Sequence, residues 1–175
     1  RLQNLGLDRS LFERYHEDAH MLDTQYRMHE GICAFPSVAF YKSKLKTWQG
    51  LRRPPSVLGH AGKESCPVIF GHVQGLTSHP AGSEWRYVLV STVRTCAKSD
   101  LDQRPTKSWL KKFLGFVVDP NQVNVAVTRA QEGLCLIGDH LLLRCCPLWR
   151  SLLDFCEAQQ TLVPAGQVRV CRRPT

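Results

Sequence analysis

The segment 119–138 constrains the fold most, because it has the pattern of one helix followed directly by one buried strand. Asp119 is a favoured helix N-cap residue, and Pro120 suits the first helical position. Four apolar residues then recur at helical spacing, which predicts one buried helix face: Val123, Ala126, Val127 and Ala130. Gly133 fits the position just past the helix end. The apolar run 134–137 predicts a strand buried on both faces, as in a parallel α/β sheet.

The other face of this predicted helix is polar. Asn124, Thr128 and Arg129 cluster there, so a rigid helix presents one fixed cation beside hydrogen-bonding groups. A solvated helix face is the alternative interpretation, and it is the better one for an arginine chosen at random.

Residues 123–130, Val-Asn-Val-Ala-Val-Thr-Arg-Ala, resemble motif VI of superfamily-one helicases, in the branch of the nonsense-mediated-decay RNA helicase. The strand behind it and a Trp-containing helix expected at 147–158 match as well. The resemblance implies that Arg129 reaches the γ-phosphate of ATP. A guanidinium is always charged and forks onto phosphate oxygens, so it can stabilise the charge of phosphoryl transfer.

A second run, Gln-Tyr-Arg-Met-His at 25–29, resembles motif IV of the same branch, and Phe-Pro-Ser follows it at 35–37. The resemblance implies that Arg27 contacts ATP phosphates as a second catalytic arginine. It also implies that Tyr26 lies by the base and that Gln25 belongs to the same cofactor site. A phenol ring can stack on adenine, and a guanidinium can pair with phosphate. Taken alone, Tyr26 fits a core aromatic residue equally well.

The resemblance breaks over residues 71–81, where the family has two further strand–helix units. We therefore expect an internal deletion that removes central strands and leaves a marginally stable domain that is molten or self-associating. Glu84 matches a family residue of the nucleotide site, although a surface glutamate before a strand is an equal alternative. The strand expected at 85–94 ends in polar residues, where open α/β sheets place ligands. With two residues of the motif VI helix, they form the predicted nucleic-acid site: Ser91, Thr92, Arg94, Asn124 and Thr128.

Basic residues outnumber acidic ones by 23 to 15, for a net charge of +8. This balance favours a polyanionic partner, RNA or DNA, with an anionic membrane surface as a distant second. Eight scattered cysteines without a Cys-x-x-Cys pair predict reduced, buried thiols in a nuclear or cytoplasmic protein. No long apolar span is present, so no membrane partner is expected.

His16 and His20 have the spacing of a metalloprotease zinc motif. That interpretation needs a continuing helix and a third ligand, and the flanking residues are polar, so we interpret both histidines as loop residues and expect no metal site. Elsewhere we expect a short helix over 7–15, a strand beginning at Met21, a surface loop over 42–63 and a polar loop over 98–112. Short strands are expected at 67–70 and 161–163, and a loose basic tail from Arg169.

The sequence thus predicts an α/β fold: a parallel sheet with helices on both faces, as a truncated second RecA-like helicase domain over 1–163, followed by a basic tail over 164–175. Because the chain begins with Arg1 rather than Met, we expect a fragment. The resemblance implies ATP with Mg²⁺ bound between this domain and a first RecA-like domain. No Walker motif is present in the sequence, so the chain alone should not hydrolyse ATP.

A closer resemblance to the helicase-with-zinc-finger group adds transcription-related proteins as expected partners, since larger members are described as nuclear-receptor coactivators. The alternative hypothesis is a module without enzymatic activity that binds nucleic acid or a protein.

Overall fold

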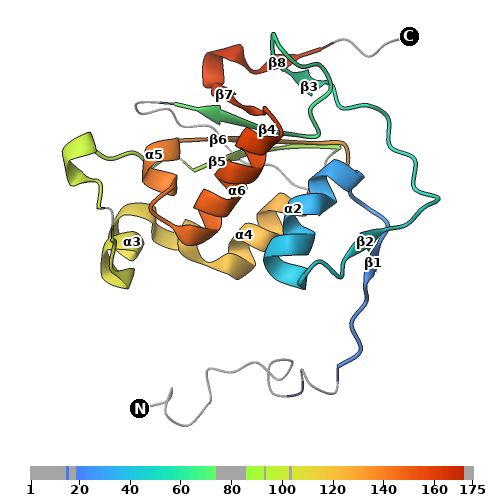
Figure 1. Ribbon diagram of the computed structural model, residues 1–175, viewed down its shortest axis with the longest axis horizontal. Coiled ribbons are helices and arrows are strands. Elements are labelled where there is room, and N and C mark those ends of the chain that lie inside the picture. The colour runs from blue at the N-terminus through green and yellow to red at the C-terminus, as the bar shows by residue number, and fades with distance from the viewer. Residues whose placement is uncertain (1–14, 16–18, 74–85, 93, 103, 172–175) are drawn as a thin grey trace.

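Four parallel strands form the centre of the protein, in the order β5-β6-β4-β7 (Figure 1). They are β4 (Val68–His72), β5 (Tyr87–Ser91), β6 (Gly133–Gly138) and β7 (Leu162–Pro164). The computed structural model describes residues 15, 19–73, 86–92, 94–102 and 104–171. Two short strand pairs lie outside this sheet. β1 (Thr24–Gln25) runs parallel to β2 (Lys46–Thr47), and β3 (Leu58–Gly59) runs antiparallel to β8 (Arg169–Val170).

The helices follow the α/β alternation of the strands. The α-helices are α2 (Glu30–Tyr41), α3 (Lys107–Leu114), α4 (Pro120–Val127), α5 (His140–Leu143) and α6 (Pro147–Ala158). Short 3-10 helices are η2 (Lys98–Asp100), η3 (Gly115–Val118) and η4 (Ala165–Gln167). Figure 1 shows α2, α4, α5 and α6 on one side of the sheet, and η4 with the β3–β8 pair on the other.

Side-chain alternation along β4 divides the core between these two faces. Val68 and Phe70 pack into the large cluster beneath the α-helices, whereas Ile69 packs against the smaller cluster beneath β3 and η4. Gly71 lets η4 approach β4, because a Cβ there would lie 3.1 Å from the Cα of Ala165. The α/β class and the parallel sheet with helical cover are confirmed. On the second face, the described helical cover is a 3-10 helix.

The helix predicted after Asp119 is confirmed. The Asp119 carboxylate accepts a hydrogen bond from the Asn121 N–H at 2.9 Å, and α4 buries Val123 and Val127. The helix ends sooner than expected, at Val127. Gly133 is therefore not a residue just past a helix but the first residue of β6, where the Tyr87 ring fills the space a side chain would need.

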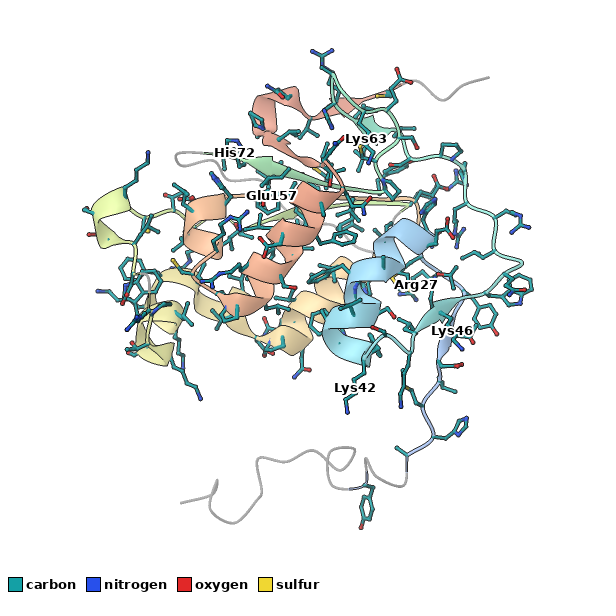
Figure 2. The ribbon with its side chains drawn as sticks, in the orientation of Figure 1. Arg27, Lys42, Lys46, Lys63, His72 and Glu157 are labelled. Atoms are coloured by element: carbon teal, nitrogen blue, oxygen red, sulfur yellow. The ribbon has the colours of Figure 1, made fainter. Side chains whose placement is uncertain are left out.

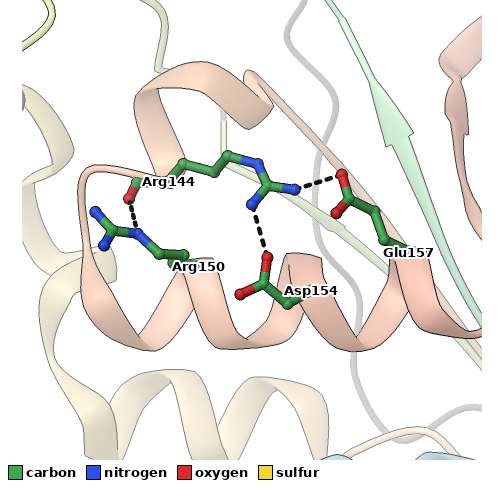
Figure 3. A network of polar contacts seen from close by, with 4 residues as sticks. All are labelled: Arg144, Arg150, Asp154 and Glu157. Atoms are coloured by element: carbon green, nitrogen blue, oxygen red, sulfur yellow. Dashed lines mark hydrogen bonds and ion pairs between the residues drawn. The ribbon is translucent and has the colours of Figure 1, made fainter.

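α6 coincides with the predicted helix over 147–158 and is tied to its neighbours by polar contacts. The Trp149 indole N–H donates to the Val117 carbonyl at 2.7 Å. The Arg144 guanidinium, just after α5, contacts the carboxylates of Asp154 and Glu157 on α6 (Figure 3). One arginine thus bridges the end of α5 to two turns of α6.

Two segments predicted to be loops, and one predicted to be a loose tail, contain regular structure. The segment 42–63 forms β2 and β3, and the segment 98–112 contains η2 and most of α3, which Thr106 caps by accepting the Trp109 N–H. Arg169 is not in a loose tail: β8 pairs with β3, and the Cys171 N–H donates to the Val57 carbonyl at 2.6 Å. The first described strand begins at Thr24 rather than Met21. The predicted helix over 7–15 and His16 lie outside the described residues, apart from an exposed Tyr15.

The four described strands form one continuous sheet, and whether central strands have been lost between β4 and β5 stays a prediction. β4 and β5 do not pair with each other, because β6 lies between them and pairs with both. Within the described residues, β5 therefore forms one edge of the sheet and β7 the other. Any segment lost between β4 and β5 has left no gap inside these four strands.

Candidate nucleotide site

The two helicase-like motifs meet through their backbones. The His29 N–H, two residues after Arg27, donates to the carbonyl of Gln131, two residues after Arg129, at 2.7 Å. This bond joins the start of α2 to the loop between α4 and β6. Both predicted catalytic arginines therefore flank one backbone junction, although the motifs are far apart in sequence.

The Gln25 side chain shapes the turn that carries Arg27. Its amide nitrogen donates to the Met28 carbonyl at 2.8 Å and to the Thr47 hydroxyl at 2.6 Å. Its amide oxygen accepts the N–H groups of Arg27 and Met28 at 2.8 and 2.7 Å. A carboxamide has two donors and two acceptor positions, so this one is fully used within the chain. Gln25, whose role in binding the cofactor stays a prediction, holds the turn between β1 and α2.

Tyr26 is an exposed residue of this turn. Its side chain is 61% exposed, which excludes the core-aromatic alternative. Its ring centroid lies 5.7 Å from that of Trp48, at an interplanar angle of 41°. The Trp48 indole passes over Gly50, where a Cβ would collide with it. The surface beside Arg27 therefore carries two solvent-accessible rings in contact.

A second arginine contacts the backbone of Arg27. The Arg53 guanidinium donates to the Arg27 carbonyl from Nε at 3.1 Å and from Nη2 at 2.8 Å. Figure 2 places Arg27 on the α2–β2 side of the molecule. A cavity of about 320 Å³ opens beside it. It is lined by His29, Glu30, Thr47, Trp48, Gln49, Leu51, Arg52 and Arg53.

The polar face of α4 is partly turned inward. The Asn124 amide donates to the Tyr41 hydroxyl at 3.1 Å, and the Thr128 hydroxyl donates to the Asn124 carbonyl at 2.7 Å. Asn124 and Thr128, both predicted to bind nucleic acid, thus contact α2 and their own helix. Arg129 is half-buried, and its Nε donates to the Val125 carbonyl at 3.1 Å, which orients the side chain along the end of α4.

The other predicted nucleic-acid residues lie at the carboxyl ends of the strands, opposite the end where Arg129 lies. Ser91 ends β5, and Thr92 follows with only 4% of its surface exposed, packed against Gly138. Arg94 is exposed, with its guanidinium 3.2 Å from a Cβ built on Gly115. Because Arg129 precedes β6 and Ser91 ends the parallel β5, the length of a strand, about 15 Å, separates the two groups.

Trp48 and Arg53 were not among the predicted site residues, and both lie in the segment expected to be a surface loop. The pattern of a tryptophan followed by two adjacent arginines could have indicated them. Just before β6, the Glu132 side chain is 4% exposed and its carboxylate lies 3.6 Å from the Arg86 guanidinium. Glu84, the remaining predicted nucleotide ligand, lies outside the described residues.

All eight cysteines are free thiols, and five of them are buried. Burial raises the pKa of Cys135 to about 11 and that of Cys156 to about 12, so both thiols stay protonated and unreactive near neutral pH. The expectation of buried thiols holds for these residues. Within the described ranges, no group of three or more His, Cys, Asp or Glu residues could hold a metal ion. Among the helices described, none has the length and apolar character to cross a membrane.

A family model described as AAA domain matches residues 7–81 and 77–141. The chain belongs to this family, as a helicase-type domain of superfamily one in the nonsense-mediated-decay-like branch. It is 70% identical to the human protein named 3'-5' exoribonuclease HELZ2, over 100% of this chain and 8% of that protein. The mouse protein of that name is 55% identical over 98% of this chain and 8% of its own length.

A more distant relative is the fruit-fly protein Regulator of nonsense transcripts 1 homolog. It is 24% identical over 90% of this chain and 19% of its own length. The chain thus spans less than a tenth of the length of the two mammalian relatives and about a fifth of the length of the fruit-fly protein. The resemblance to superfamily-one helicases is confirmed.

Proposed function

We propose that this chain forms half of an ATP site as the second motor domain of an RNA helicase. Arg27 and Arg129 act as arginine fingers on the phosphates, and Tyr26 lies by the base. The observation that carries the proposal is the backbone bond from His29 to Gln131, which puts both arginines at one junction. An exposed tyrosine beside that junction supports a site for a nucleotide.

The other half of the site belongs to a first RecA-like domain. The sequence contains no Walker lysine and no Asp-Glu-Ala box to hold Mg²⁺. This chain therefore binds MgATP weakly and supplies charge to a site that the first domain completes. Phosphoryl transfer consists largely of positioning and charge stabilisation, so arginines offered from a second domain raise turnover without any acid–base chemistry of their own.

RNA is the proposed polyanion. The net charge of +8 favours a nucleic acid, and the names of both groups of relatives, an exoribonuclease and a regulator of nonsense transcripts, refer to RNA. Of the predicted contacts, Arg94 is exposed and can reach RNA at the carboxyl ends of the strands. Ser91 is a second, half-buried candidate, whereas Thr92, Asn124 and Thr128 are held by internal contacts. The free thiols support a nuclear or cytoplasmic site of action.

We also propose that a segment is deleted between β4 and β5. The family model matches in two pieces that overlap at 77–81, and the alignment with the human relative covers 247 positions for a chain of 175 residues. The domain then extends over 1–163, with 164–175 as a basic extension that includes β8. Transcription-related partners rest on the helicase-with-zinc-finger resemblance alone.

The test is binding of a non-hydrolysable MgATP analogue to the full chain, measured by nuclear magnetic resonance. We expect millimolar-range binding that perturbs signals at 25–29 and 128–131, and that weakens in Arg27→Ala and Arg129→Ala. Equal binding by wild type and both variants would refute the arginine-finger assignment. Binding of RNA that does not respond to nucleotide, even after addition of the first domain, would favour the module without enzymatic activity.

A further inference from the structure

The segment that follows β2 packs against the motif IV turn on two sides. Trp48 contacts the Tyr26 ring, and the Arg53 guanidinium donates two hydrogen bonds to the Arg27 carbonyl. Both residues come from a stretch rich in arginine and proline that has no regular structure. These contacts join two exposed rings and two guanidinium-bearing residues in one place, and two of the four, Trp48 and Arg53, also line the cavity.

We propose that the segment 48–53 is part of the nucleotide site, with Trp48 as a second ring for the base and Arg53 as a positioning residue for Arg27. This inference rests on the proposed function. Trp48 is 49% exposed although an indole gains from burial, so its ring is open to a flat ligand. The absence of a side chain at Gly50 allows the indole to lie here beside Tyr26, because a Cβ at Gly50 would collide with the ring.

Arg53 acts through the backbone rather than on the ligand. Its two N–H groups converge on one carbonyl, and together with Gln25, which holds the Arg27 N–H, they fix both sides of the Arg27 peptide. The backbone of Arg27, and with it the direction of the Cα–Cβ bond, is therefore set by neighbours before a nucleotide arrives. Pre-ordering a charged group lowers the cost of binding phosphate. A lysine at 53 would keep the charge but could not reproduce the two-pronged contact.

Two probes separate the roles of the ring and the arginine. A non-hydrolysable MgATP analogue has base and phosphates, whereas inorganic tripolyphosphate has phosphates alone. We expect Trp48→Ala to weaken binding of the analogue about tenfold, as typical for loss of one stacking ring, and to leave tripolyphosphate unchanged. Trp48→Phe should retain most of the affinity. If Trp48→Ala weakens both probes equally, or neither, the ring does not hold the base.

Arg53→Ala should weaken both probes about tenfold, because a charge-assisted contact that orders Arg27 is lost. Lys44→Ala is the matched control: it removes one positive charge from an exposed side chain just before β2, in the connection from α2. Arg53→Lys should recover less than half of the loss. An effect of Arg53→Ala no larger than that of Lys44→Ala would overturn the positioning role.

A double variant shows whether Arg53 works through Arg27. In an Arg27→Ala background, Arg53→Ala should cause no further loss, because the group that it positions is gone. Full additivity of the two losses would contradict the inference. If instead Arg27→Ala alone leaves both affinities unchanged, the proposed function itself fails. Thermal melting of each variant identifies unfolding, and Arg53→Lys keeps the test valid if Arg53→Ala does not fold.

Discussion

The imidazole rings of His72 and His140 lie 4.6 Å apart, at the carboxyl end of β4 and the start of α5. Within the described part of the chain, the Nδ1 atom of each is buried without a hydrogen-bond partner. Burial, followed by the nearby His72, lowers the pKa of His140 from its ordinary value of 6.5. The charges of Asp139, Arg144 and Glu157 also act on it, Arg144 in the same direction as His72 and the two carboxylates against it.

We therefore predict that acid destabilises the fold through His140. Its folded pKa lies below the unfolded value, so the stability it contributes is present above about pH 6.5 and is lost as the pH falls through the folded pKa. Urea unfolding between pH 8 and pH 5 should show a smaller decline in His140→Gln than in wild type. His20→Gln, at an exposed position, is the control and should follow wild type. Identical slopes in all three proteins would contradict the prediction.

A methyl group at position 133 should destabilise the protein. A Cβ there would lie 2.6 Å from the Tyr87 ring and 2.9 Å from the Ser56 hydroxyl, both in close packing. We expect Gly133→Ala to lower the free energy of unfolding by about 1–3 kcal/mol, the usual cost of overpacking. Gly166→Ala is the matched control, since no atom lies within 4 Å of a Cβ there. Chemical denaturation of both variants measures the difference, and equal stabilities would contradict the packing described.

Arg129→Lys should separate turnover from nucleic-acid binding when this chain is joined to a first RecA-like domain. Lysine keeps the charge but loses the planar fork, so we expect steady-state ATPase activity to fall roughly a thousandfold, or about 4 kcal/mol in barrier. RNA binding should keep its affinity and salt dependence, because it draws on many phosphate contacts. Turnover within a few-fold of wild type, or a collapsed salt slope, would make Arg129 an ordinary surface or RNA contact.

The β5 edge should promote self-association. β5 is the outer strand of the described sheet, and Leu89 on it is 38% exposed. Exposed edges with apolar side chains pair with other chains, and a lysine there opposes pairing. We expect sedimentation of wild type to depend on concentration and Leu89→Lys to shift the protein toward monomer. Val125→Lys, at an exposed apolar position on α4, is the control. A wild type that stays monomeric at high concentration would contradict this prediction.

The sequence predicted best those elements whose pattern is local. The cap at Asp119 and the apolar stripe around Trp149 each lie within one helix, so their bounds at the start of α4 and along α6 were predictable. β3 and β8 have two residues each, too few to show a period, and they form because distant segments pair. Tertiary contacts also decide the site. Nothing near Arg53 in sequence indicates that it reaches Arg27, and nothing near Asn124 indicates that its amide turns toward Tyr41.

The place of β6 between β4 and β5 also sets the order in which the chain can fold. Val68 and Val88 both pair beside Leu134, so neither of the earlier strands has its neighbour until the later one exists. During synthesis, β4 and β5 leave the ribosome before residues 133–138 and stay unpaired with β6 until those residues follow. Their apolar residues are exposed throughout that interval, so chaperone binding to the nascent chain is expected to peak before β6 emerges and to end soon after it.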